Sequence, residues 1–377
     1  MPLVSLLAIP PAERNKLRRD LLAWFAARKR NLPWRRTKDP YRIWLSEIML
    51  QQTRVAAAIP YYMRFTAKFP AVKALARART QTVLGLWAGL GYYSRAKNLQ
   101  RAAREIVALH GGEFPREYEQ ALALPGVGRY TAAAVLSIAY EQPLAVLDGN
   151  VARVLARLGA VRGDLRAPVR WRSMEAAAQD LLARQAPGDW NQAMMELGAT
   201  VCTPKSPSCQ ECPISRWCQA RKLGIAAALP ETRKKRETVK VTLAAAVLLD
   251  PRGQTLLLRQ ADGDGDLFSH MWQFPAVETS EAAASELSRH LHSKFAGMAG
   301  GVLQPLKTVR HAVTFRNIHI QPFLIAVEKL PRLTGTRAVL LRGLGKLPIS
   351  NLTRKIAVTA LAHLSTLPEN AALDRPV

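Results

Sequence analysis

Apolar residues recur at helical spacing along the first 225 or so positions of the chain. Within residues 14–29 the recurring apolar positions are Leu17, Leu21, Trp24 and Phe25. This spacing predicts helices that turn one face toward a core. Turns rich in glycine or proline separate the helical stretches. Further helices are expected at 71–88, 94–109, 116–123, 129–140, 150–159, 168–185 and 189–200.

One expected helix combines a clear start signal with an unusual charge. Asp39 and Pro40 are typical of the N-cap and first position of a helix, and the stretch WLSEIMLQQT follows them. Glu47 lies in the middle of this stretch, with apolar residues one turn away on both sides. Burying a carboxylate without a partner is costly. Glu47 therefore reaches solvent, pairs with an arginine such as Arg42 or Arg54, or has a chemical task.

The pattern changes beyond residue 228. The segment 229–240 (LPETRKKRETVK) is charged and lacks an apolar face, which is typical of a linker. Upstream of it the chain predicts an all-helical domain, at 1–228. Downstream, at 241–368, the pattern predicts a second domain of mixed type.

Strands and helices alternate in this second domain. Two apolar runs flank the turn DPRG at 250–253, and this arrangement predicts a strand pair. A second pair is expected within 305–328, with helices near 279–295 and 351–366. The fold class is therefore multidomain, with an all-helical domain followed by an α+β domain.

The charge of the chain indicates a polyanionic partner. Its 377 residues include 54 Lys and Arg against 28 Asp and Glu, which gives a net charge of +26. Nucleic acid is the leading candidate for a partner of so basic a protein. No stretch approaches the ~18–20 uninterrupted apolar residues of a membrane span. The N-terminus also lacks the basic region and cleavage site of a signal peptide, so we expect an intracellular protein.

All four cysteines lie in one short loop, CTPKSPSCQECPISRWC. Cys202, Cys209, Cys212 and Cys218 have the spacing C-x6-C-x2-C-x5-C. Clustered thiols in an intracellular chain indicate a metal site rather than disulfides. The spacing alone leaves two alternatives: a zinc site with four cysteine ligands or an iron–sulfur cluster, which one compact loop favours. The site is expected to be structural in either case.

A short hairpin of helices is expected around LPGVGRYTAAAVLSIAY. Gly126 and Gly128 would leave backbone N–H groups bare at a helix N-terminus, where a phosphate binds without needing a side chain. The alternative is an ordinary turn between two helices. The strongly basic composition favours binding of the DNA backbone here.

A second carboxylate is available in the stretch VLDGNVARVLARL. Asp148 and Asn150 precede a helix, and an N-cap is the ordinary interpretation of such an aspartate. If Asp148 faces Glu47, however, the pair matches the logic of glycoside hydrolysis. Burial raises the pKa of a carboxyl such as Glu47 and lets it act as a general acid, while an ionised Asp148 would stabilise a sugar cation.

Aromatic and basic residues also occur together in two loops, NLPWRR and GLGYYSR. Such residues can stack on extruded bases or wedge into a duplex. Core packing is the alternative for any one of them, including Trp34 and Tyr93.

The helical domain resembles the helix-hairpin-helix DNA glycosylases, and within them the members specific for adenine. The resemblance rests on LPWRR, SEIMLQQTRV, GLGYYSRAKNL, LPGVGRYTA, LDGNVARVLARL, NQAMMELGA and the cysteine loop, all in order. It covers the whole helical domain and implies a 4Fe–4S cluster rather than zinc. It also implies removal of adenine mispaired with 8-oxoguanine or guanine, after base flipping, in base excision repair.

The resemblance also implies roles for single residues. Glu47 would protonate adenine, and Asp148 would stabilise the oxocarbenium ion or form a transient covalent adduct with the sugar. Tyr130 and Asn150 would support these two residues. The remaining implied contacts are Arg35 and Gln192 to the flipped base, Gln52 and Tyr92 around the opposite base, and Trp34 and Phe315 to DNA.

Tyr130 separates this chain from the bifunctional members of the superfamily, which carry a lysine right after the GVGR turn. That lysine forms a Schiff base and leads to strand cleavage, whereas a phenol does not form a Schiff base. We therefore expect a monofunctional enzyme. A bifunctional glycosylase for damaged pyrimidines and a non-catalytic lesion binder are the alternatives. Tyr130 disfavours the first, and the presence of both Glu47 and Asp148 disfavours the second.

The second domain resembles the Nudix-like domain that recognises 8-oxoguanine in this family. LFSHMWQFP at 267–275 matches an early loop of that domain. The acidic helix of Nudix hydrolases is missing from 275–300, so we expect no magnesium-dependent nucleotide hydrolysis. The family's Thr-Phe-Ser-His loop is TFRN here: Phe315 keeps the aromatic ring, while Arg316 and Asn317 replace Ser and His. We expect a monomer that binds mispaired duplex DNA in the bacterial cytosol or nucleoid.

Overall fold

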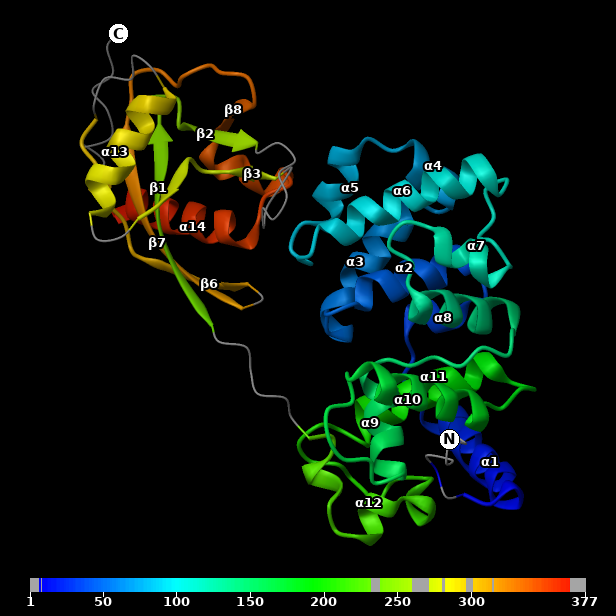
Figure 1. The fold of residues 1–377 in the computed structure, drawn as a ribbon. Coiled ribbons are helices and arrows are strands. Elements are labelled where there is room, and N and C mark those ends of the chain that lie inside the picture. Colours follow the sequence, from blue (N-terminus) through cyan, green and yellow to red (C-terminus); the bar gives the residue numbers. More distant parts are fainter. Residues whose placement is uncertain are drawn as a thin grey trace. The chain divides into compact units, whose positions relative to one another are not determined.

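The chain forms two compact units. Figure 1 shows a computed structural model that describes Leu7 and residues 9–231, 238–259, 271–279, 282–295, 301–313 and 315–366. The first unit is Met1–Ala78 with Ser94–Lys234, and the second is Arg79–Tyr93 with Lys235–Val377. The domain boundaries expected from the sequence stay a prediction. Of the expected linker, residues 232–237 lie outside the described residues.

The first unit is built from helices, as the apolar pattern predicts. Its α-helices are α1 (Pro11–Arg28), α2 (Pro40–Leu50), α3 (Val55–Lys68), α4 (Val72–Arg77), α6 (Ser94–Leu109), α7 (Tyr118–Ala123), α8 (Arg129–Tyr140), α9 (Gly149–Leu158), α10 (Pro168–Leu181), α11 (Pro187–Thr200) and α12 (Gln219–Lys222). Short 3-10 turns are η1 (Pro33–Arg36), η2 (Ser215–Trp217) and η3 (Ala226–Ala228).

Two details of the helical prediction were wrong. Helix α3 was not among the expected helices, and it forms with Pro60 inside it. The single helix expected at 71–88 is two helices. Ala78 and Arg79 adopt extended backbone conformations that end α4 before α5 (Thr80–Trp87) begins.

Helix α2 is buried on nearly every side. Its start is the expected one: the Asp39 side chain accepts a hydrogen bond from the backbone N–H of Tyr41 at 2.9 Å, and Pro40 is the first helical residue. From Tyr41 to Met49 every residue except Arg42 is buried, so α2 lies inside the unit rather than on its surface. Glu47 is buried with its neighbours and is only 6% exposed.

Helices α7 and α8 form the expected hairpin. Gly126 in the connecting turn has a φ of +76°, a left-handed conformation that L side chains rarely adopt. A Cβ added there would also lie 2.8 Å from the Cβ of Asn98. Gly128 is the N-cap of α8 and has an ordinary φ of −94°. Only the first of the two glycines is therefore required by backbone geometry.

Helix α11 lies against α8 and α9 at two glycines. A Cβ on Gly188 would lie 2.7 Å from the backbone oxygen of Ser137 on α8. A Cβ on Gly198 would lie 2.7 Å from the Cβ of Asn150 on α9. These close approaches bring the N-terminus of α9 and the inner face of α11 together.

The second unit contains a mixed β-sheet between two helices. Its elements besides α5 are β1 (Val239–Leu249), β2 (Gln254–Arg259), β3 (Trp272–Gln273), β4 (Ala276–Glu278), α13 (Ala283–Lys294), β5 (Gln304–Pro305), β6 (Val309–Val313), β7 (Arg316–Ala326), β8 (Thr336–Leu340), η4 (Leu341–Lys346) and α14 (Asn351–Thr366). The main strand order is β3-β2-β1-β7-β5. Strands β1 and β7 are parallel, from the pair Val239 and Arg316 to the pair Leu249 and Ala326.

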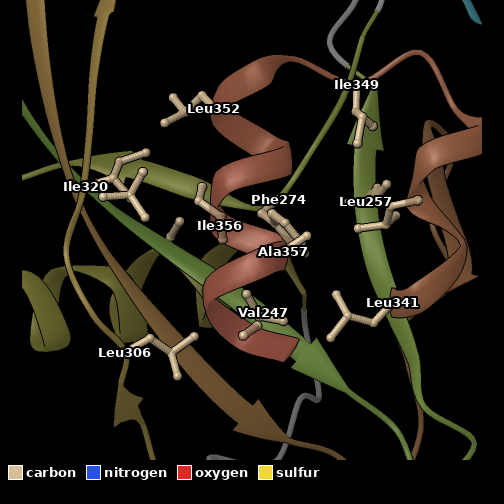
Figure 2. Packing of buried hydrophobic residues seen from close by; sticks show 14 of the residues in the cluster. Val247, Leu257, Phe274, Leu306, Ile320, Leu341, Ile349, Leu352, Ile356 and Ala357 are labelled. Carbon is tan, nitrogen blue, oxygen red and sulfur yellow. The ribbon is translucent and has the colours of Figure 1, made fainter. Parts of the chain in front are cut away.

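Alternate residues of β1 face opposite cores, as the two-residue period of a strand requires. Ala245 and Val247 pack with Ile356 of α14 in the core of Figure 2. Ala246 and Leu248 pack in a second core that includes residues of α13. The uninterrupted apolar run of β1 is thus explained by burial on both faces.

The expected strand pairs at 241–259 and 305–328 are present as β1 with β2 and β6 with β7. Residues 267–270 of the expected early loop and Thr314 of the TFRN loop lie outside the described residues. Among the described helices, none is long and apolar enough to cross a membrane.

The contact at Gly198 can be tested by adding one methyl group. Gly198→Ala should lower the free energy of unfolding by about 1–3 kcal/mol, because neither Asn150 nor its backbone can move away without shifting α9. The measurement is the thermal unfolding midpoint. Gly149→Ala is the matched control, since a Cβ there meets nothing within 4 Å. Equal midpoints for the two variants would contradict the close packing of α11 on α9.

Candidate active site

The first unit contains a cavity of about 480 Å³ that collects most of the sequence-predicted site residues. Its walls come from η1, α2, α8, α11 and the start of α9. The predicted residues that line it are Trp34, Arg35, Glu47, Gln52, Tyr130, Asp148, Asn150 and Gln192. Its size is within the range typical of ligand pockets.

Glu47 lies at this cavity and has one direct hydrogen-bond partner among the predicted residues. The Tyr130 hydroxyl donates to its Oε2 at 2.6 Å. Burial, with a contribution from the charge of Asp148, raises the pKa of Glu47 to about 7, although the bond from Tyr130 and the charge of Arg35 oppose the shift. At neutral pH a substantial fraction of Glu47 is therefore protonated. Its alternative partner Arg42 instead lies 3.5 Å from Asp39.

Tyr130 comes from the first turn of α8 and bridges two helices. Its hydroxyl also lies 3.1 Å from the Sδ of Met195 on α11. Burial and the neighbouring carboxylates Glu47 and Asp148 raise the pKa of the phenol well above its ordinary value. Tyr130 therefore remains a hydrogen-bond donor, and it orients the Glu47 carboxyl toward α11.

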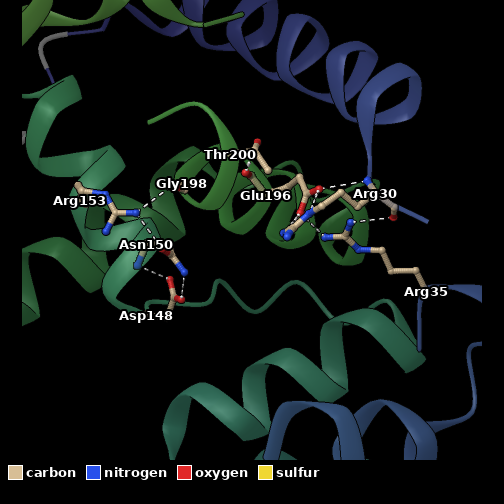
Figure 3. A network of polar contacts seen from close by, with 8 residues as sticks. All are labelled: Arg30, Arg35, Asp148, Asn150, Arg153, Glu196, Gly198 and Thr200. Carbon is tan, nitrogen blue, oxygen red and sulfur yellow. Dashed lines mark hydrogen bonds and ion pairs between the residues drawn. The ribbon is translucent and has the colours of Figure 1, made fainter. Parts of the chain in front are cut away.

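Asp148 is both an N-cap and a cavity residue. Its Oδ1 accepts from the backbone N–H groups of Asn150 at 2.9 Å and Val151 at 2.7 Å. Its Oδ2 accepts from the Asn150 side-chain amide at 2.9 Å (Figure 3). Three N–H donors thus hold the Asp148 carboxyl group at the start of α9, in contrast to the apolar surroundings of Glu47. The two carboxyl groups at this cavity therefore have unlike environments.

Buried arginines connect this site with the cysteine loop, and sequence analysis did not identify them. Arg153 donates to the Asn150 side-chain oxygen at 2.8 Å and to the backbone oxygen of Cys202 at 2.8 Å. Arg157 donates to the Sγ of Cys202 at 3.2 Å and to the backbone oxygen of Thr203 at 2.7 Å. The two arginines are one helical turn apart on α9, downstream of Asp148, and this spacing was the only signal in the sequence.

The four cysteines line one small cavity of their loop. Burial, together with the other thiols, raises the pKa of Cys212 to about 12 and also raises that of Cys218. Four thiolates can therefore coexist there only around a positively charged metal group. The donor set fits an iron–sulfur cluster, which these four residues would hold.

Glu196 organises the other wall of the active-site cavity. It is 1% exposed and accepts two hydrogen bonds from the Arg30 guanidinium, both at 2.7 Å. Arg35 donates to the same carboxylate at 2.9 Å (Figure 3). Burial alone would raise the pKa of Glu196, but these bonds outweigh burial and lower the pKa to about 2. Arg35 is thus held at the cavity wall by a partner for which sequence analysis proposed no role.

The other predicted residues fall into two groups. Trp34 lines the cavity. Its ring also packs edge-on against the ring of Tyr62, with ring centroids 5.3 Å apart, so Trp34 is both a core residue and a cavity residue. The Gln192 amide donates to the backbone of Gly188 at 3.3 Å. Tyr92 and Phe315 belong to the second unit, as does Tyr93. Their roles at a DNA lesion stay predictions.

Removing the charge of Glu196 tests the ion-pair network. Glu196→Gln should lower the free energy of unfolding by about 1–3 kcal/mol at pH 7, because it leaves two arginines without their carboxylate. The pKa of Glu196 is lowered from 4.5 to about 2, so its stabilisation is present above pH ~4.5 and is lost as the pH falls toward 2. The difference between native and variant midpoints should shrink from pH 7 to pH 3. Asp180→Asn, which breaks the more exposed pair with Arg14, should cost less than about 1 kcal/mol.

Comparison with known proteins agrees with this geometry. Residues 45–179 match the HhH-GPD superfamily of base excision DNA repair proteins, and residues 202–218 match the iron–sulfur binding domain of endonuclease III. The second match confirms the expected iron–sulfur cluster, of the 4Fe–4S type, and excludes the zinc alternative. Among solved structures, a thermostable thymine-DNA glycosylase has a TM-score of 0.52 at 28% identity, covering 56% of this chain and 98% of that one.

Two curated relatives are adenine DNA glycosylases. The human protein is 49% identical over 220 residues, which are 56% of this chain but only 40% of that protein. The rat protein is 37% identical over 371 residues, which cover 84% of this chain and 72% of that protein. The rat match extends beyond the helical unit into the second one. The chain therefore belongs to the adenine DNA glycosylase family.

Proposed function

We propose that this protein removes adenine mispaired with 8-oxoguanine or guanine by hydrolysing the N-glycosidic bond, and that it does so without efficient strand cleavage. The observation that carries the proposal is the pair of unlike carboxyl groups at one cavity. Glu47 is buried with a pKa raised to about 7, and Asp148 accepts three N–H bonds. One supplies a proton and the other a negative charge, as cleavage of a glycosidic bond requires.

The reaction would begin with an adenine that has left the duplex and entered the cavity. Protonated Glu47 donates its proton to a ring nitrogen, which makes the base a better leaving group. Positive charge develops on the sugar as the bond lengthens. The Asp148 carboxylate, held by N–H groups at the N-terminus of α9, stabilises that charge or bonds to the sugar carbon before water replaces it. Tyr130 keeps the Glu47 carboxyl in position throughout.

The cavity wall would orient the base. Arg35 presents a guanidinium that Glu196 holds at 2.9 Å, so its position is fixed before the base arrives. Gln192 and Trp34 also line the cavity and offer an amide and an aromatic edge. Side chains that are already held in position lose little conformational entropy when a ligand binds.

Recognition of the duplex would rest on other segments. The turn with Gly126 and Gly128 presents backbone N–H groups to a phosphate. Gln52, in a left-handed conformation at φ 55°, would face the opposite base, with Tyr92. Phe315 would contact 8-oxoguanine from the second unit, where Arg316 lies 5.4 Å from its ring.

The proposed reaction is tested with a duplex that carries adenine opposite 8-oxoguanine. Incubation should give a nick only after alkali, because base loss without a Schiff base leaves the strand intact. A direct nick without alkali would contradict the monofunctional assignment. No nick after alkali would contradict excision and favour a non-catalytic binder. A duplex with adenine opposite thymine is the control and should stay intact.

The acid role of Glu47 predicts a pH profile. Its pKa is raised from 4.5 to about 7, so the protonated form dominates at pH 6 and falls to roughly one tenth at pH 8. The single-turnover excision rate should therefore decline as the pH rises above ~7. Well above the pKa, the rate should fall by about tenfold for each pH unit. Glu47→Gln should reduce the rate by more than about 10³-fold while duplex affinity changes little. Excision that survives in this variant would refute the assignment.

A further inference from the structure

The segment that delivers Asp148 to the cavity has no secondary structure of its own. It comprises residues 143–147, between α8 and α9. Val146 and Leu147 are buried, and backbone groups that are shielded from water need hydrogen-bond partners. Among the described strands none pairs with this segment to supply them. Four of these groups instead bind the side-chain amides of two other helices.

Asn191 on α11 serves one edge of the segment. Its Oδ1 accepts from the backbone N–H of Val146 at 3.2 Å, and its Nδ2 donates to the backbone oxygen of Leu144 at 2.7 Å. The second amide hydrogen goes to the Ser137 hydroxyl on α8 at 2.8 Å. Asn191 is 2% exposed. One buried amide thus ties α11 and α8 to the chain two residues before Asp148.

Gln179 on α10 serves the other edge. Its Oε1 accepts from the backbone N–H of Ala145 at 2.9 Å, and its Nε2 donates to the backbone oxygen of Pro143 at 2.8 Å. Asn191 thus binds Leu144 and Val146, whereas Gln179 binds Pro143 and Ala145, so the two amides bind alternate residues of the segment. We call Asn191 and Gln179 together the amide clamp.

We propose that the amide clamp positions Asp148 for catalysis; this inference rests on the function proposed above. The hydrogen bonds within the Asp148 N-cap fix its carboxylate relative to α9. Packing of α11 on α9 at Gly198 already limits how α9 can move relative to α11. The amide clamp adds a constraint on the chain before Asp148, because Asn191 connects both α8 and α11 with the segment. Asn191 and Gln179 are positioning residues, since neither lines the cavity.

Isosteric variants test this assignment. Asn191→Asp and Gln179→Glu each replace an NH₂ donor by an oxygen and keep the side-chain size. With enzyme in excess over the adenine:8-oxoguanine duplex, Asn191→Asp should lower the excision rate by ~10²-fold, the loss typical of a misplaced catalytic group. Gln179→Glu should lower the rate only several-fold, because Gln179 is half-buried and water can replace its amide. Affinity for an uncleavable duplex should stay within about twofold of native in both variants.

Gln142→Glu is the matched control. Gln142 directly precedes the segment, and its amide also donates to a backbone oxygen, that of Arg116 at 2.7 Å. It does not bind residues 143–147 through its side chain. The same chemical change there should leave the excision rate at the native value. A loss equal to that of Asn191→Asp would overturn the amide clamp as the cause.

A pH series separates positioning from a general loss of structure. The carboxyl group introduced by Asn191→Asp can donate a hydrogen bond again once it is protonated. The ratio of this variant's rate to the native rate should therefore rise between pH 8 and pH 5. Asn191→Leu keeps the volume but cannot donate at any pH, and its ratio should stay flat. A flat ratio for both variants would contradict the donor role.

Hydrogen exchange at the amides of Ala145 and Val146 tests the clamp without reference to activity. Exchange at Val146 should accelerate in Asn191→Leu and exchange at Ala145 in Gln179→Met, because each variant removes the oxygen that accepts from that amide, with helices α8 and α11 unchanged. If the native protein does not release adenine, the proposed function fails, while exchange still tests the amide clamp. If it releases adenine and the variants match it in rate, the positioning role is refuted. Should the Asn191 variants fail to fold, the Gln179 variants decide: a native rate in Gln179→Glu together with native exchange in Gln179→Met would refute the clamp.

Discussion

The site depends on keeping one carboxyl group away from water. Glu47 lies on a helix whose residues are nearly all buried, so burial raises its pKa to about 7. The cost of that burial is lowered by the hydrogen bond from Tyr130. Two other helices complete these surroundings: α8 supplies the phenol of Tyr130, and α11 supplies Met195 and Glu196 at the cavity wall. Asp148 lies at the same cavity but is held by three N–H donors.

Other buried charged side chains of the first unit have hydrogen-bond partners inside the protein. Glu196 satisfies two arginines at the cavity wall. Arg153 and Arg157 extend from α9 to the cysteine loop, so the helix that begins with Asp148 ends in contact with the ligands of the cluster. The cluster takes no part in the proposed acid–base chemistry. Its loop instead fixes the far end of α9, while the amide clamp fixes the approach to its N-terminus.

The sequence allowed part of this arrangement to be predicted. The N-cap at Asp39, the buried Glu47 and the cysteine loop follow from local patterns, because each signal lies within a few residues. Helix α3 was missed, and it carries Pro60, a residue type that ordinarily interrupts a helix. Glu196, Arg153 and Asn191 could not be assigned, because each has partners in segments that are distant in the sequence. The role of a buried polar side chain can be assigned only when the positions of its hydrogen-bond partners in distant segments are known.

The long parallel pairing in the second unit has a consequence for synthesis of the protein. Strand β1 pairs along its whole length with β7, which lies far downstream. On the ribosome, β1 emerges first and must wait with its apolar residues uncovered until the chain through Ala326 has been made. The helical unit also needs distant segments, since Arg30 pairs with Glu196, but both lie upstream of β1 and have been made before it emerges. The helical unit can therefore fold during translation, whereas β1 depends on chain that is made later and on protection from aggregation until then.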